Sequence, residues 1–304
     1  MNTKLNTEAG ICLLAVNDVN RLLEVTLLSI LENSNSQIYI GYVGNKIPEL
    51  AITNKQINWI ELHDEYEIET DDHTYKSFGN DSFYKIVKLK WELISSVINL
   101  DHKFIIYNDL DVVWLREADK YISLSFDNFT KTDILIQSFT RNPHDPLLCM
   151  GFVALRNCQE NKKLLGILKL KHNKMYEPGS QLGDDEVITK YYHESEFNEK
   201  IKELPQSTFP VGNFLDLYVR NSYYPGIPKL EPIIFHANYV IGIKSKLRLI
   251  YIILKKFQKT YYFGSTVKKI KFEIYLMKFV YLVKLIFPSF QFRMPKTRRI
   301  KNIR

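Results

Sequence analysis

Residues 103–116 read Lys-Phe-Ile-Ile-Tyr-Asn-Asp-Leu-Asp-Val-Val-Trp-Leu-Arg, which places Asp109 and Asp111 between two apolar segments. The apolar run at 104–107 predicts a buried strand that ends just before the two acids. Open α/β sheets bind ligands beyond the carboxyl ends of their strands, so we expect both acids at such an edge. A hard divalent cation would compensate two neighbouring carboxylates and keep open positions for substrate phosphates. Taken alone, the short Asp-x-Asp pattern favours a simpler interpretation, a polar strand end with two exposed acids.

The sequence ahead of this stretch predicts a β-α-β-β order. Residues 10–16 predict a first buried strand, and residues 37–43 and 57–62 predict two more. Between the first two strands lies a helix whose apolar residues share one face: Leu22, Leu23, Leu27, Ile30 and Leu31. This order favours a parallel sheet with a nucleotide near the end of the first strand. The sequence contains neither Gly-x-Gly-x-x-Gly nor a Walker lysine motif, so it has no dinucleotide fingerprint and no P-loop.

Helices and strands alternate again after residue 80. Residues 81–98 and 159–172 predict helices, and residues 134–139 and 149–156 predict strands. Gly151 lies inside the second of these strands, where the absence of a side chain lets a ligand approach the backbone closely.

Three consecutive acids, Asp184, Asp185 and Glu186, open a further helix that continues through residues 187–192. Acids at a helix start complement the helix dipole, so a cap explains Asp184. Three acids in a row exceed what capping needs, which keeps a catalytic role open.

His236 follows an apolar segment, residues 232–235, that predicts the last strand. A histidine at a strand end suits a structural hydrogen bond. It also precedes Gly242 and Lys244, which are groups suited to phosphate.

The composition is that of an ordinary globular protein, with 45% hydrophobic and 25% charged residues among 304. Such a length gives one large domain or two small ones. Three cysteines without Cys-x-x-Cys spacing indicate neither a disulfide framework nor a zinc site, and favour a reducing compartment. We expect no signal peptide and no transmembrane helix, because no stretch reaches the ~18 uncharged apolar residues that a span needs.

Charge divides the chain in two. Residues 244–304 hold 17 Lys plus Arg and one acid, Glu273, whereas residues 1–243 hold 24 basic and 33 acidic residues. We therefore predict a body, residues 1–246, and a basic, aromatic-rich helical region, residues 247–304. Lysines alternate with aliphatic and aromatic residues in that region, which suits an interfacial segment on an anionic membrane. Two alternatives stay open, a helical subdomain packed on the body and nucleic-acid binding, for which there is no motif.

The ordered set of motifs resembles the nucleotide-diphospho-sugar transferase family, GT-A-fold glycosyltransferases related to glycosyltransferase family 77. The set comprises Phe78-Gly79 before the helix with Trp91, residues 107–115, Met150-Gly151-Phe152, Asp184-Asp185-Glu186, and His236-Ala237-Asn238-Tyr239 with Gly242 and Lys244. The resemblance covers residues 10–246. It implies an α/β fold, with a GT-A-type Rossmann-like mixed sheet flanked by helices as the catalytic domain.

The resemblance implies roles around the donor diphosphate. Asp109 and Asp111 would hold Mn²⁺ or Mg²⁺ there, and His236 would complete the metal shell. Gly242 and Lys244 would lie near the diphosphate. A bound metal and a lysine stabilise the charge that a departing nucleoside diphosphate carries.

The resemblance also implies positions for the nucleoside and the sugar. Ala15-Val16-Asn17 would meet the nucleoside, and Met150-Gly151 would lie near the donor sugar or the acceptor. Asp185, with Asp184 beside it, would be the catalytic carboxylate, because the anomeric centre becomes oxocarbenium-like and a nearby carboxylate stabilises it. Family members of this kind retain the anomeric configuration.

We therefore predict a metal-dependent glycosyltransferase, peripheral on the cytoplasmic face of a membrane through its C-terminal tail. It would move a hexose or pentose from a nucleotide-diphospho-sugar, with UDP-sugars foremost, to a glycan or lipid-linked acceptor in surface polysaccharide or glycoconjugate synthesis. Glu186 departs from the family, in which Gln is common at that position. The alternative is a non-catalytic membrane- or nucleic-acid-binding protein with a degenerate transferase body. The presence of Asp109, Asp111, His236 and Lys244 argues against such decay.

Overall fold

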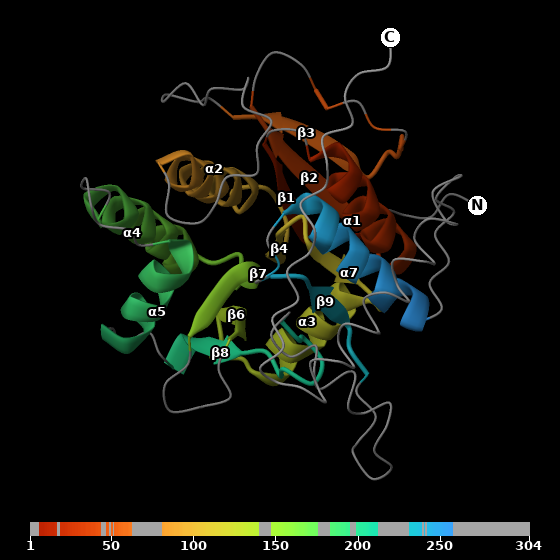
Figure 1. Ribbon diagram of the computed structural model, residues 1–304. Coiled ribbons are helices and arrows are strands. Elements are labelled where there is room, and N and C mark those ends of the chain that lie inside the picture. The colour runs from red at the N-terminus through yellow and green to blue at the C-terminus, as the bar shows by residue number, and fades with distance from the viewer. Residues whose placement is uncertain are drawn as a thin grey trace, which may run out of the picture. The chain divides into compact units, whose positions relative to one another are not determined.

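The computed structural model describes residues 6–16, 19–43, 47–48, 50, 52–62, 81–139, 147–175, 183–194, 199–211, 231–238, 240 and 242–257. The chain divides into two compact units, Met1–Lys259 and Thr260–Arg304, and every described residue belongs to the first. Seven strands form one sheet in the order β3-β2-β1-β4-β7-β6-β8, and β5 pairs with β9 in a small second sheet. Figure 1 shows the sheet with helices on both of its faces.

The strands are short and mostly apolar: β1 (Asn6–Ala15), β2 (Ser36–Tyr42), β3 (Ile57–Glu61), β4 (Phe104–Asn108), β5 (Val112–Trp114), β6 (Ile134–Ser138), β7 (Leu148–Arg156), β8 (Ile201–Glu203) and β9 (Ile234–His236). β1 pairs in parallel with β2 and with β4, whereas β7 runs antiparallel to β4 and β6. Both β4 and β6 are buried along their whole length, as expected for strands covered on both faces. The predicted α/β class with a mixed sheet is confirmed.

The helices form two layers: α1 (Asn20–Asn33), α2 (Asp81–Val97), α3 (Ala118–Asn128), α4 (Gln159–Met175), α5 (Asp184–Glu194) and α7 (Ile243–Lys256). Apolar residues of α2, α4 and α5 pack with alternate residues of β1, β4, β6 and β7 in one buried cluster. The helices α1 and α7 lie together on the opposite face (Figure 1). Sheet faces and helix stripes thus bury each other, which is what drives this architecture.

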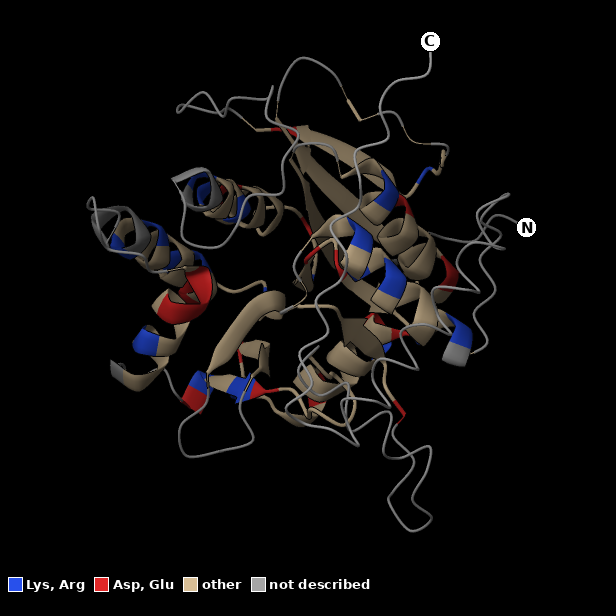
Figure 2. Ribbon diagram, viewed as in Figure 1, with Lys and Arg blue, Asp and Glu red and all other residues tan. Residues whose placement is uncertain are grey.

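Helix α7 crosses the boundary predicted between residues 246 and 247. Its apolar side chains are buried in the first unit: Leu247, Leu249, Ile250, Ile253 and Leu254. Figure 2 shows that basic residues are spread along α7. The division into body and tail stays a prediction, since residues 258–304 lie outside the described part of the chain. Among the residues that the structure describes, no helix combines the length and apolarity needed to cross a bilayer.

Candidate functional site

The turn between β4 and β5 holds Asp109 and Asp111. Asn108 is fully buried and donates from Nδ2 to the carbonyl oxygens of Asp109, at 2.8 Å, and of Val112, at 3.1 Å. The Oδ1 atom of Asn108 accepts from Trp114 Nε1 at 2.9 Å. The Val112 amide closes the turn by donating to the Asp109 carbonyl oxygen at 3.0 Å. The side chains of both acids therefore project from a hydrogen-bonded turn at the end of β4, a central strand of the sheet.

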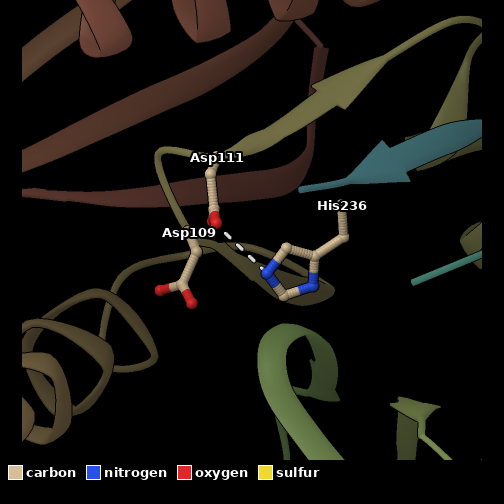
Figure 3. Close-up of side chains that lie close together, drawn as sticks. All are labelled: Asp109, Asp111 and His236. Atoms are coloured by element: carbon tan, nitrogen blue, oxygen red, sulfur yellow. Dashed lines mark ion pairs between the residues drawn. The ribbon is translucent and has the colours of Figure 1, made fainter. Parts of the chain in front are cut away.

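Strand β9 brings His236 to this turn. Val112 of β5 lies opposite His236, and the Ala237 amide donates to the Asp111 carbonyl oxygen at 2.9 Å. The side chains of Asp111 and His236 point toward each other, with His236 Nε2 3.3 Å from Asp111 Oδ1 (Figure 3). One ligand atom each from Asp109, Asp111 and His236 lies within 4.8 Å of the others. The structure thus brings together the three residues predicted as metal ligands.

Gln137 of β6 determines which nitrogen of His236 carries a proton. Gln137 Nε2 donates to the carbonyl oxygens of Phe209, at 3.1 Å, and Pro210, at 3.3 Å. The Oε1 atom of Gln137 therefore faces His236 Nδ1 at 3.0 Å. Because an amide oxygen can only accept a hydrogen bond, Nδ1 is the donor. In the neutral ring, Nε2 then presents a lone pair toward the Asp111 carboxylate.

The lone pairs of His236 Nε2 and the Asp111 carboxylate would repel each other. Either a cation between them or a second proton on the imidazole removes this repulsion. A histidine oriented by a hydrogen bond to its other nitrogen is typical of metal-ligating imidazoles. The carboxylate oxygens of Asp109 and Asp111 are ligands that Mn²⁺ and Mg²⁺ prefer, and an imidazole nitrogen suits a transition metal such as Mn²⁺. The residues present therefore fit a divalent cation.

Lys246 of α7 also contacts Asp111, with Nζ 2.6 Å from Oδ2. Burial alone would raise the pKa of Asp111, but Lys246 and His236 outweigh burial and hold that pKa well below its ordinary value. The lysine predicted from the sequence to lie near the diphosphate is Lys244, which is exposed in the first turn of the same helix. Gly242 precedes the helix with φ at +87°, a conformation that glycine adopts at no steric cost.

A second buried lysine, Lys90 of α2, connects the site to α5 and was missed by sequence reasoning. Its Nζ lies 2.5 Å from Asp184 Oδ2, 3.5 Å from Asp109 Oδ1 and 3.4 Å from the Met150 carbonyl oxygen. It also lies 4.6 Å from the centre of the Tyr107 ring. Burial alone would lower the pKa of Lys90, but Asp109 and Asp184 raise it well above its ordinary value. Lys90 therefore stays charged and holds two acids.

Asp185 follows Asp184 in the first turn of α5 but has different surroundings. Its Oδ1 accepts a hydrogen bond from the Met150 amide at 2.6 Å. Burial first, and then the charge of Asp184, raise the pKa of Asp185 well above its ordinary value. Glu186 has one buried carboxylate oxygen, Oε2, with no hydrogen-bond partner among the described residues. A carboxyl with a perturbed pKa beside a charged cluster, as Asp185 has, is typical of functional sites.

Gly151 of β7 lets the backbone approach the acids and the histidine. Its carbonyl oxygen accepts from the Asp109 amide at 2.7 Å. A Cβ atom at this position would lie 2.2 Å from His236 Cε1 and 2.9 Å from Asp109 Oδ2. The groups packed against Gly151 are the cluster's own side chains, and the predicted approach of a ligand to Gly151 stays a prediction.

The residues predicted to meet a nucleoside lie at the end of β1. Ala15 and Val16 are buried there, and Asn17 lies outside the described residues. Because β1 and β4 are parallel neighbours, the end of β1 lies at the same sheet edge as Asp109.

Comparisons with known proteins agree with this geometry. The model of the nucleotide-diphospho-sugar transferase family matches residues 50–250, well over half of the chain. UDP-D-xylose:L-fucose alpha-1,3-D-xylosyltransferase 3 of Arabidopsis thaliana is 24% identical over 190 residues, which cover 59% of this chain and 49% of that protein. A second Arabidopsis thaliana enzyme of that name, MGP4, is 21% identical over 188 residues, covering 59% and 51%. The chain thus spans about half the length of these curated relatives.

Among solved structures, an active-site mutant of LgtC superposes with a TM-score of 0.52 at 11% identity, over 80% of this chain and 95% of that chain. This likeness concerns the fold, and it confirms the predicted GT-A architecture.

Proposed function

Because the chain belongs to the nucleotide-diphospho-sugar transferase family, we propose that it is a metal-dependent glycosyltransferase that moves a sugar from a UDP-sugar to a glycan or lipid-linked acceptor. The observation that carries this proposal is the convergence of Asp109, Asp111 and His236 in one cluster. The relatives' names specify UDP-xylose, which makes it the first donor to test. The acceptor belongs to surface polysaccharide or glycoconjugate synthesis in this proposal.

The side chains divide the chemistry among them. Asp109, Asp111 and His236 would hold Mn²⁺ or Mg²⁺, whose charge stabilises the departing nucleoside diphosphate. Lys246 adds positive charge beside Asp111, and Lys90 keeps Asp109 and Asp184 in place.

Asp185 is the proposed catalytic carboxyl. The Met150 amide orients this carboxyl group. Its raised pKa favours the protonated form in the free protein, and nearby positive charge, from a bound cation or a reacting sugar, would favour the ionised form that stabilises such a sugar. We also propose that the anomeric configuration is retained, which an NMR spectrum of the first-formed product tests.

A donor screen tests the enzyme proposal. The purified protein is mixed with MnCl₂ and UDP-xylose, UDP-glucose, GDP-mannose or a CMP-linked sugar, and its Tm and donor hydrolysis are measured. At least one donor is expected to raise Tm and to be hydrolysed. If no donor does either, the enzyme proposal fails.

Matched aspartate variants test the metal site. Asp111→Asn should abolish donor hydrolysis and Mn²⁺ binding measured by calorimetry. Asp133→Asn is the control, because Asp133 is ion-paired with Lys200 and Arg156 away from the cluster. Equal effects of the two substitutions would remove the metal assignment.

The proposed location is the cytoplasmic face of a membrane, supported by the basic residues of the C-terminal region. Residues 258–304 contain 12 Lys plus Arg and one acid. Because α7 packs in the first unit, a deletion that tests this region must begin after Lys259. The full chain should sediment with anionic vesicles and the shortened chain should sediment less. Equal sedimentation would refute an anchoring role for the tail.

A further inference from the structure

The outward face of α4 exposes apolar side chains where a solvated helix carries polar ones. Ile167 and Leu170 are 39% and 62% exposed, one turn apart. Gly166 lies beside them with open space, since no atom would lie within 4 Å of a Cβ there. The opposite face of α4 is buried in the core through Leu164, Leu165 and Leu168. The exposed side of α4 therefore carries two apolar side chains that the core does not cover.

Lysines flank the exposed apolar face. The α4 segment contains five lysines and a single acid, Glu160. At about 100° per residue, exposed Lys163 lies one turn before Ile167 on the same face, exposed Glu160 lies two turns before Ile167, and Lys171 lies along the edge of that face. Figure 2 shows basic residues along the α4 ribbon. An apolar stripe with lysines beside it is typical of a helix that lies in a membrane interface.

A second copy of the chain fits this face poorly. A symmetric dimer places the same patch on both partners, so two helices with a large excess of lysines would face each other. Juxtaposed like charges oppose association. Anionic lipid headgroups supply the opposite charge, and lysine stems extend along apolar surface while their ammonium groups reach the phosphates.

We propose that α4 is a membrane-contact helix, with Ile167 and Leu170 inserted at the headgroup level of an anionic bilayer and Lys163 at its phosphates. This contact is formed by residues of the first unit, and the proposal does not depend on the proposed enzyme activity. Helix α4 packs against α2 and α5, which supply Lys90 and Asp184. Docking would therefore bring a lipid surface beside two helices of the site.

A local fluorescence experiment on the full chain tests the contact. Leu170→Trp and Leu124→Trp are compared on phosphatidylcholine vesicles that contain phosphatidylglycerol. Leu124 is the matched control, because it is 63% exposed on α3 and has acidic Asp127 one turn later. The new indole at 170 should shift to shorter wavelength and be quenched by brominated lipid, and the indole at 124 should do neither. No quenching at 170, or equal quenching at both, overturns the proposal.

Charge and self-association supply two further measurements. Lys163→Ala should lower the vesicle partition coefficient about fivefold, whereas Lys120→Ala on α3 should leave it unchanged. Pure phosphatidylcholine should bind the wild-type chain more weakly. A dimer in analytical ultracentrifugation that Leu170→Glu dissociates would assign the face to a second copy and refute lipid contact. Hydrolysis of a soluble donor should be unaffected by Leu170→Glu, so the two proposals fail separately.

Discussion

Lys90 Nζ lies 2.5 Å from Asp184 Oδ2, and each side chain is only 8% exposed. The chain contains a second pair of the same length, Lys103 Nζ with Glu8 Oε1, in which the side chains are 72% and 40% exposed. The two pairs differ in burial and hardly in geometry. Removing one member of a buried pair leaves an uncompensated charge, whereas solvent screens an exposed pair.

We predict that Lys90→Met lowers the free energy of unfolding by about 3 kcal/mol or more, because Asp184 and Asp109 lose their buried counterion. Lys103→Met is the control and should leave stability unchanged. Urea unfolding followed by circular dichroism measures both. Similar small effects of the two substitutions would show that the buried pair contributes no more than the surface pair.

Two glycines should respond to alanine in opposite directions. Gly151→Ala places a Cβ atom 2.2 Å from His236 Cε1, so it should destabilise the fold by about 1–3 kcal/mol and weaken Mn²⁺ binding. Gly166→Ala meets open space in the middle of α4 and should stabilise the fold by up to about 1 kcal/mol. Thermal unfolding and calorimetric titration with Mn²⁺ measure the two effects. Unchanged Mn²⁺ affinity in Gly151→Ala would contradict the described approach of β7 to the cluster.

Asp185→Asn should raise stability at neutral pH while it lowers the proposed transferase activity. The folded state raises the pKa of Asp185, so the unfolded chain releases this proton first as pH rises above about 3.9, the ordinary value. The free energy of unfolding of the wild-type chain therefore decreases as pH rises above that ordinary value, and Asp185→Asn, which has no proton to release, does not show this decrease. Below the ordinary pKa, both chains should unfold with equal free energy. A variant that is less stable than wild type at neutral pH would refute this assignment.

Lys246→Ala and Lys244→Ala distinguish the lysine that contacts Asp111 from the one predicted from sequence. Lys246 Nζ lies 2.6 Å from Asp111 Oδ2, and Lys244 is exposed. We expect Lys246→Ala to lower donor affinity at least tenfold, roughly the effect of losing one charge-assisted hydrogen bond. Lys244→Ala should change affinity little. Titration calorimetry with UDP and Mn²⁺ tests this, and the opposite ranking would restore Lys244 to the diphosphate.

The strands could be predicted because burial leaves a strong pattern in the sequence. The run at 104–107 became β4, and 149–156 became β7, each with one residue added. β1 was predicted too short, because Asn6, Thr7 and Glu8 are polar. Asn6 nevertheless lies opposite Ser36 in the ladder with β2. Pairing with a neighbouring strand overrides the preferences of individual residues at such an end.

Acids and the histidine of the site could be predicted from motifs, but the groups that hold them could not. Lys90 was missed because lysines on helices are usually solvated, although Ile86 and Ile94 one turn to either side mark its face as apolar. Gln137 is likewise a polar residue in an otherwise apolar strand, which could have indicated a buried hydrogen-bonding role. Lys246 follows Gly242 by about one helical turn, and only the start of α7 shows that it, rather than Lys244, reaches Asp111.

The pairing of β5 with β9 has a consequence for the order in which the protein is made. During synthesis, Lys246 emerges from the ribosome 135 residues after Asp111, and His236 emerges shortly before Lys246. N-terminal portions of a chain fold first during synthesis. A nascent chain can therefore form β1 to β7 before His236 and Lys246 are available to contact Asp111. Truncated chains that end before β9 should therefore fold in part but lack His236, one of the three proposed metal ligands. The proposed metal site would therefore be completed only near the end of synthesis of the first unit.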